Sequence, residues 1–335
     1  MKLIENIKKN TIVLLIITFI ILYVVLKDDF NGIVDSMIRM DLKYVIVALV
    51  CYFLSVSIKG FVNYLIINDK SKINLKEAIK HNWITQFFNG ITPFSTGGQP
   101  MEVYMITEHG ISLPKATNQT VQSFIFYQIA LVICGLVAVI YNFVFHIFPK
   151  VKLLQHLVLL GFAINIAVVI ALLLISSSKR VTKSLSKLSI KVLKTLKIKV
   201  NEKEITKKFE DYYKGFQDLK KRKDLTIAGI LLNIASLLCL YIVPFFILQG
   251  MGDFTSLNIA DTLTASAYVY LIGAFIPIPG ASGGIEYGFT QFFGNFIGLR
   301  EIAVTLIVWR FITYYLGVII GGLLFSLEEK VKKWE

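Results

Sequence analysis

Two loops of one pattern occur once in each half of this 335-residue chain: proline, two variable residues, a hydroxyl residue and two glycines. The first is Pro93-Phe94-Ser95-Thr96-Gly97-Gly98 and the second is Pro279-Gly280-Ala281-Ser282-Gly283-Gly284. Proline cannot continue a helix and pushes the residue before it out of the helical conformation. Paired glycines permit positive φ and the close approach of another group. The pattern therefore predicts two broken helices.

Three ionisable residues accompany these loops inside apolar sequence. Glu102 follows the first loop, Glu286 follows the second, and Arg310 lies in the apolar run 302–326. A charge within such a run is costly and is a hypothesis of function. Each glutamate also suits the positive end of a helix dipole, so a structural role stays open. Arg310 has two interpretations, an ion pair with one of the acids or a bidentate ligand for a phosphate.

Composition predicts an all-α polytopic membrane protein. The chain is 55% hydrophobic and 17% charged, whereas about a quarter of a soluble domain is charged. Six uncharged runs are, or can be extended to, the roughly 20 residues that a spanning helix needs, namely 11–26, 44–58, 118–148, 153–178, 225–250 and 302–326. The first is interpreted as a retained span, because no small-residue cleavage site follows it. The second can run on past Lys59, which we expect to extend to the membrane surface.

Charge sets the expected orientation, because basic loops face the cytoplasm. Residues 179–224 hold 16 Lys or Arg against 6 Asp or Glu and supply +10 of the net charge of +13. This basic linker separates a first half, 1–178, from a second half, 225–335. It serves either as a solvated topology signal or as a surface for anionic lipids.

The two interrupted stretches are predicted to be re-entrant hairpins. Residues 80 and 179 are both expected inside with two spans between them, so 81–106 must enter and leave from the cytoplasm. The same counting makes 262–299 a hairpin from the outside. Opposed broken helices in matching halves indicate an inverted repeat and a transport site, with helix N-termini that favour anions.

The two hairpin tips are expected to meet near the bilayer midplane, with the three ionisable residues close by. A pair of purely structural kinks is the alternative. The predicted lipid-binding residues are Pro93, Ser95, Thr96, Gly97, Gly98, Gln99, Glu102, Pro279, Ser282, Gly283, Gly284, Glu286 and Arg310.

Metal, cofactor, nucleotide and nucleic-acid sites are not predicted. The chain has three cysteines within apolar runs and four scattered histidines, namely Cys51, Cys134, Cys239, His81, His109, His146 and His156. Neither set has the spacing of a zinc site. No Gly-Lys-Ser/Thr phosphate loop is present, which argues against ATP as an energy source.

The segments 91–100 and 277–286, which contain the two loops, resemble the flippase-like transmembrane domain of the lysylphosphatidylglycerol synthase/flippase family, a UPF membrane family. The resemblance covers roughly residues 8–327. It implies translocation of aminoacylated phosphatidylglycerol in a bacterial cell (inner) membrane, resistance to cationic antimicrobial peptides, and a homodimer. The chain ends at Glu335, nine residues after the last predicted span, so we expect no synthase domain and no aminoacylation.

Three functions stay open from the sequence. The first is a phospholipid flippase. The second is a membrane enzyme of phospholipid metabolism, with Glu102 or Glu286 as general base and Arg310 as headgroup ligand. The third is an ion-coupled carrier of a small anion, in which the acids couple protons.

Overall fold

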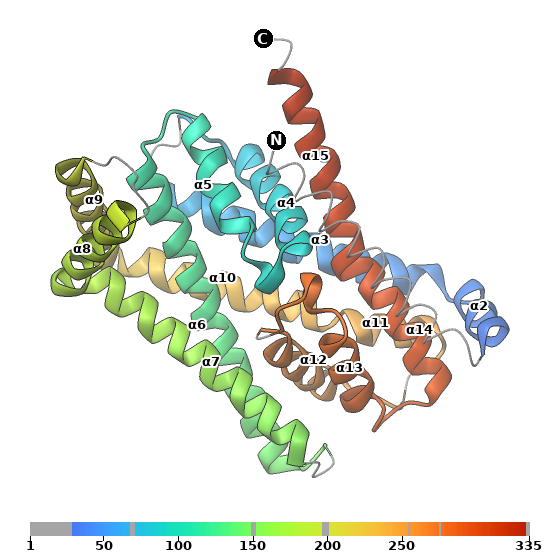
Figure 1. Cartoon of the computed structure of the whole chain (residues 1–335). Coiled ribbons are helices and arrows are strands. Elements are labelled where there is room, and N and C mark those ends of the chain that lie inside the picture. Colours follow the sequence, from blue (N-terminus) through green and yellow to red (C-terminus); the bar gives the residue numbers. More distant parts are fainter. Residues whose placement is uncertain are drawn as a thin grey trace.

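The computed structural model describes residues 29–67, 71–148, 152–195, 201–253, 255–274 and 276–332. Figure 1 shows that these residues are almost entirely helical. Five helical stretches among them are long and apolar enough to cross a membrane: Leu42–Ile66, Leu113–Phe145, His156–Ser177, Lys223–Gly250 and Leu299–Glu328. They match five of the six predicted spans and confirm an all-α polytopic fold. The predicted span 11–26 lies outside the described residues.

The spans are built from straight and from interrupted helices. A short helix α2 (Phe30–Ile38) precedes them, and the spans are α3 (Leu42–Ile66), α6 (Leu113–Phe145), α7 (Lys152–Ser177), α10 (Lys223–Tyr241) with α11 (Val243–Gly250), and α14 (Leu299–Arg310) with α15 (Leu316–Lys332). Pro244 near the start of α11 has no N–H group to continue the helix, and this accounts for the break after α10. A π-helical turn, Phe311–Tyr315, joins α14 to α15.

Two helical hairpins occupy the interrupted stretches. The first hairpin consists of α4 (Leu75–Ile91) and α5 (Gly98–Glu108), and the second of α12 (Ile259–Gly273) and α13 (Gly284–Phe293). The predicted bounds are wrong at two ends. Helix α4 already begins at Leu75, and Leu299 belongs to α14 rather than to the second hairpin. The turn between α13 and α14 carries no charge, so the apolar pattern does not reveal where the hairpin ends.

The hairpins approach each other from opposite sides (Figure 1). The first hairpin opens toward the side on which α15 ends, and the second opens toward the side where α6 ends and α7 begins. Their tips are the loops 93–98 and 279–284, which are in contact through the 3₁₀ turns Pro93–Ser95 and Pro279–Ala281. This is the opposed geometry that the inverted repeat predicts.

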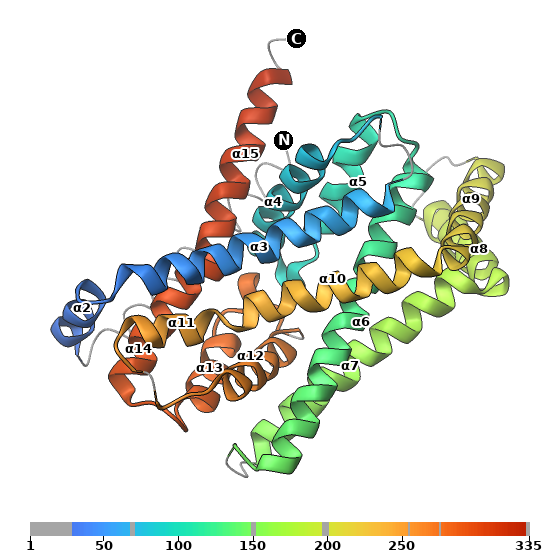
Figure 2. The same ribbon diagram turned by 180° about the vertical axis from the view of Figure 1, so that it is seen from behind.

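Packing between the two halves is reciprocal. The spans that precede the two hairpins, α3 and α10, lie side by side (Figure 2). Helix α15 of the second half packs along α4 of the first hairpin, and α6 of the first half packs along α12 of the second. Two units related by a pseudo-twofold axis exchange contacts in this way.

Small residues and aromatic rings fill the interfaces of these helices. A Cβ at Gly60 of α3 would lie 2.7 Å from the Cα of Ile79, so α3 and α4 approach more closely than larger residues allow. Phe289 of α13 stacks on Trp309 of α14 with ring centroids 4.8 Å apart. The second hairpin is therefore held against the span that carries Arg310.

The basic linker folds into two helices, α8 (Lys179–Thr195) and α9 (Glu202–Lys221). Helix α9 is attached to the spans: Asn118 Nδ2 donates to the Tyr212 carbonyl at 2.7 Å, and the Tyr212 hydroxyl lies 2.8 Å from Ser176 Oγ. Asn118 lies near the start of α6, so α9 packs on the side toward which the first hairpin opens.

Candidate functional site

The first three residues of each loop, and the residue before them, share one backbone conformation. The residue before each proline is extended, with φ/ψ of −114°/144° in the first tip and −116°/142° in the second. The residue after each proline is left-handed, at 53°/17° for Phe94 and 63°/15° for Gly280. The following residues, Ser95 and Ala281, have φ of 53° and 51°. Non-glycine residues rarely adopt positive φ, so this part of each loop is constrained. The loops then diverge: Thr96 has φ/ψ of −86°/−9° and Ser282 of −60°/145°, and Gly97 has φ of −79° and Gly283 of 88°.

The side chains at the end of α4 bind the backbone of the first tip. Thr92 Oγ1 accepts from the Gly97 N–H group at 2.9 Å, and Asn89 Oδ1 accepts from the Gly98 N–H group at 2.9 Å. Pro100 follows in the first turn of α5 and has no N–H group. Donors that the sequence suggested for an anion are thus already engaged within the protein.

A buried ion pair organises the second tip. Arg310 Nε lies 2.8 Å from Glu286 Oε1, and Glu286 Oε2 accepts from the Gly283 N–H group at 2.6 Å. Arg310 Nη2 donates to Ser282 Oγ at 3.1 Å and to the Gly280 carbonyl at 3.2 Å. The structural interpretation of Glu286 and Arg310 is therefore the one that the contacts support, since both groups bind the tip.

Tyr314 links this pair to the first hairpin. The Arg310 guanidinium carbon lies 4.4 Å from the centroid of the Tyr314 ring. The Tyr314 hydroxyl donates to the carbonyl of Gly90, in the last turn of α4, at 2.8 Å. Glu286, Arg310, Tyr314 and Gly90 thus form a continuous set of contacts from one hairpin to the other.

A cavity of about 600 Å³ lies where the tips meet. Ser95 and Thr96 of the first tip line it together with Gly280 and Ala281 of the second. Residues of both hairpins and of α3, α6, α7, α10 and α14 form the rest of its walls. Its volume falls within the roughly 300–1,000 Å³ of small-molecule sites. The cavity is polar for a membrane interior, with amide side chains that include Asn63, Asn82, Gln86, Gln128, Asn165 and Asn233.

The charged side chains that line the cavity, among the described residues, are Lys59, Glu102 and Arg310. Lys59 Nζ lies 4.2 Å from the centroid of the Tyr127 ring. The expectation that Lys59 extends to the membrane surface is wrong, because its side chain turns into the cavity, where the ring attracts the cation. Glu102 Oε1 accepts from Asn63 Nδ2 at 2.5 Å, so this acid is held within the first half.

The predicted residues divide into two groups. Six line the cavity: Ser95, Thr96, Gly98, Gln99, Glu102 and Arg310. Seven instead shape the two tips: Pro93, Gly97, Pro279, Ser282, Gly283, Gly284 and Glu286. Their part in binding a lipid stays a prediction.

Sequence reasoning missed Lys59, Asn63, Tyr127, Asn165 and Asn233, which all line the cavity. Lys59 was expected at the membrane surface, and the other four lie on spans that were identified by their apolar character alone. The signal was present, because polar side chains inside apolar runs need partners or a wet cavity. Asn165 and Asn233 each donate to the backbone carbonyl one turn earlier, at 2.8 Å.

The sequence suggested four scattered histidines, but two of them lie close together in the structure. The rings of His81 and His109 have centroids 5.1 Å apart. The first hairpin folds back on itself, so residues at its open end become neighbours although they are far apart in sequence.

Comparison with known proteins agrees with this architecture. The family described as "lysylphosphatidylglycerol synthase TM region" matches residues 10–321. A UPF0104 membrane protein of Archaeoglobus fulgidus is 24% identical over 268 residues, which cover 75% of this chain and 76% of that relative. The family match includes both tips and the helices that surround the cavity, and the chain therefore belongs to the family of the lysylphosphatidylglycerol synthase TM region.

Proposed function

We propose that this protein is a phospholipid translocase that passes a lipid headgroup through the cavity between the two tips. The observation that carries the proposal is the cavity of about 600 Å³ between the opposed hairpins, with its amide and charged lining side chains. Broken helices that meet in this way are typical of transporter sites. A headgroup gains hydrogen bonds there while its acyl chains stay in hydrocarbon.

The charges of the cavity favour a headgroup that carries both signs. The ammonium of Lys59 offers a partner for a lipid phosphate, and the carboxylate of Glu102 offers one for an ammonium group. Arg310 is engaged by Glu286, so it contributes mainly to the wall. Aminoacylated phosphatidylglycerol, such as lysylphosphatidylglycerol, has this chemistry, and the family description names the same lipid.

Transport is proposed in preference to catalysis. The two candidate general bases are both bound in the protein: Glu286 to Arg310 and Gly283, and Glu102 to Asn63. A general base needs a lone pair within reach of the substrate proton. Both oxygens of Glu286 are engaged and Glu286 does not line the cavity, which supports a binding cavity over a reaction centre.

The proposal extends to location and orientation. We propose a bacterial cell (inner) membrane with both termini in the cytoplasm. The first hairpin opens on the side where α9 of the basic linker packs and α15 ends, and basic segments face the cytoplasm. Export of lysylphosphatidylglycerol from that side lowers the negative charge of the outer leaflet, which weakens binding of cationic peptides. A homodimer is the assembly that we propose.

The test is a lipid-protection assay. The purified protein is placed in liposomes with a headgroup-labelled phospholipid, and a membrane-impermeant reductant reports the label that reaches the outer leaflet. We expect faster loss of protected label than in empty liposomes, and an unchanged rate would overturn the proposal.

Lys59→Met should slow translocation about tenfold or more, because a hydrogen bond to a charged group contributes about 1.5–3 kcal/mol. The matched control is Lys43→Met, since Lys43 lies at the start of the same helix, pairs with Asp41 at 2.8 Å and is exposed.

Uptake of a soluble anion by the same liposomes would instead indicate the carrier, and new lipid species detected by mass spectrometry would indicate the enzyme.

A further inference from the structure

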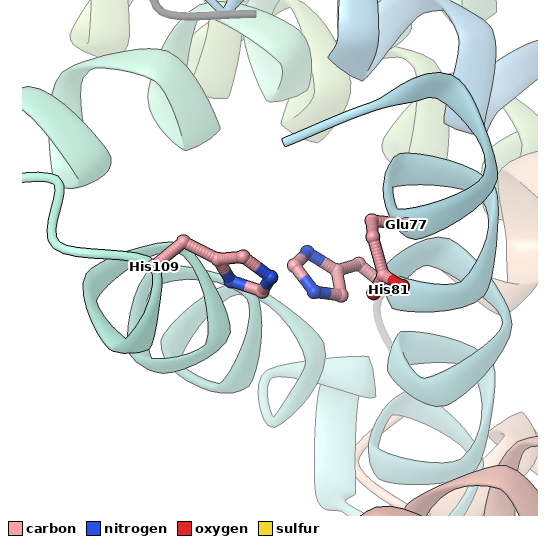
Figure 3. Close-up of side chains that lie close together, drawn as sticks. All are labelled: Glu77, His81 and His109. Carbon is pink, nitrogen blue, oxygen red and sulfur yellow. The ribbon is translucent and has the colours of Figure 1, made fainter. Parts of the chain in front are cut away.

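Three metal-ligating side chains meet at the open end of the first hairpin. Glu77 and His81 lie on α4, and His109 caps the end of α5. One ligand atom from each lies within 4.8 Å of the others. Figure 3 shows the two imidazoles facing each other across the space between the helices, with Glu77 beside His81. The cluster lies away from the tips and does not line the cavity.

Local structure accounts for this meeting. Glu77 and His81 are four residues apart on one helix, so they share a face. His109 is brought opposite them because the chain reverses at the first tip and α5 returns along α4. The cluster thus joins the two ends of the hairpin.

His109 is oriented for ligation by its own helix. Its Nδ1 lies 2.9 Å from the Met105 carbonyl oxygen. A carbonyl oxygen only accepts, so Nδ1 carries the proton and Nε2 keeps its lone pair. A second-shell contact of this kind fixes the tautomer and the ring of most metal-bound histidines.

We propose that Glu77, His81 and His109 bind a divalent transition-metal ion such as Zn²⁺. Two histidines and one glutamate are an established zinc ligand set that leaves the fourth position for water. Bonds of about 2.0–2.1 Å place ligand atoms roughly 3.4 Å apart in a tetrahedron. Closing from 4.8 Å to that spacing moves each atom by roughly 0.7 Å, which side-chain rotation supplies.

Lys80 competes with this ion for the carboxylate of Glu77. Its Nζ lies 2.6 Å from Glu77 Oε2 and 3.6 Å from Glu328 Oε1 of α15. Glu328 can remain paired with the Lys80 ammonium when a metal ion binds Glu77. The ion would then close the base of the hairpin whose tip lines the cavity.

Metal binding is measured on the full chain, purified with a tag that contains no histidine. Co²⁺ is titrated while its visible absorption is followed, and retained Zn²⁺ is measured by mass spectrometry after gel filtration. We expect one ion per chain and the absorption bands of tetrahedral Co²⁺. Wild-type protein that retains no Zn²⁺ and gives no Co²⁺ bands would overturn the proposal.

Variants locate the ion. His81→Gln and His109→Gln should each weaken binding about tenfold or more, whereas His146→Asn should not, because His146 is exposed at the far end of α6 with φ of 51°, which asparagine tolerates. Undiminished binding by the double variant His81→Gln/His109→Gln would contradict the site.

Lys80→Met should bind the ion more tightly, since it frees Glu77, and a folding defect cannot produce that gain. Weaker binding by Lys80→Met would contradict the role of Glu77. The translocation assay is scored separately, so failure of the metal site and failure of the proposed function are distinguishable.

Discussion

Arg310 and Glu286 form an ion pair of 2.8 Å whose residues are only 6% and 7% exposed. The pair joins α14 to the second tip, at the level where that tip meets the first. Removing one partner of a buried pair leaves an uncompensated charge, which costs about 3–5 kcal/mol.

We therefore predict that Glu286→Gln and Arg310→Met each destabilise the protein by about 3–5 kcal/mol. The double variant should recover part of this loss, because no charge is then left alone. Thermal unfolding in detergent measures all three. Strictly additive losses would show that the two groups do not act as a pair.

The hydrogen bond from Tyr314 to the Gly90 carbonyl connects the second half to the first hairpin. Tyr314→Phe should lower stability by about 0.5–1.5 kcal/mol and should slow translocation, because the two tips lose a shared contact. Tyr287→Phe is the matched control, since Tyr287 is 41% exposed. Equal effects of the two variants in the lipid-protection assay would argue against this link.

Gly280 and Phe94 hold equivalent positions in the two tips, but a Cβ fits only at the position of Phe94. Gly280 has φ of 63°, and a Cβ there would collide with the Tyr314 ring. Gly280→Ala should therefore cost more than the 1–2 kcal/mol of the left-handed conformation, roughly 2–4 kcal/mol in all. Phe94→Ala, the control, keeps a side chain at the same φ and should stay within about 1 kcal/mol. Similar melting temperatures for the two variants would contradict the predicted clash.

Much of the fold follows from the sequence because membrane insertion imposes simple rules of length, apolarity and charge. The five described spans and the opposed tips were predictable on those grounds, and the repeated Pro-x-x-Ser/Thr-Gly-Gly pattern located both tips. The end of the second hairpin was not predicted, since the turn 294–298 carries no charge that would mark it. The two helices α8 and α9 were also not predicted, since residues 179–224 were treated as one linker.

The candidate site was less predictable than the fold. Loop residues stood out by their unusual conformational demands, whereas the direction of a side chain on a span depends on helix rotation and on neighbours. Lys59 was for that reason assigned to the membrane surface, although it contacts Tyr127 in the cavity. The meeting of His81 with His109 likewise depends on the fold of the hairpin and not on sequence spacing.

Glu102 should set headgroup preference if the lipid carries an ammonium group. Glu102→Gln removes the charge and leaves an oxygen for Asn63 Nδ2, so the local hydrogen bond can persist. Translocation of lysylphosphatidylglycerol should fall about fivefold relative to phosphatidylglycerol, the equivalent of about 1 kcal/mol. Parallel assays with the two lipids give the ratio, and an unchanged ratio would contradict a role for the carboxylate in selectivity.

Cross-linking tests most directly whether a lipid headgroup occupies the cavity between the tips. A phospholipid with a photoreactive headgroup is incorporated into liposomes that contain the protein, and adducts are mapped by mass spectrometry. We predict adducts on the cavity-lining segment around Ser95 and Thr96 and on α3 near Lys59, with loss of both under excess unlabelled lipid. Adducts confined to the exposed outer faces of α6 and α7, with none at the tips, would contradict it.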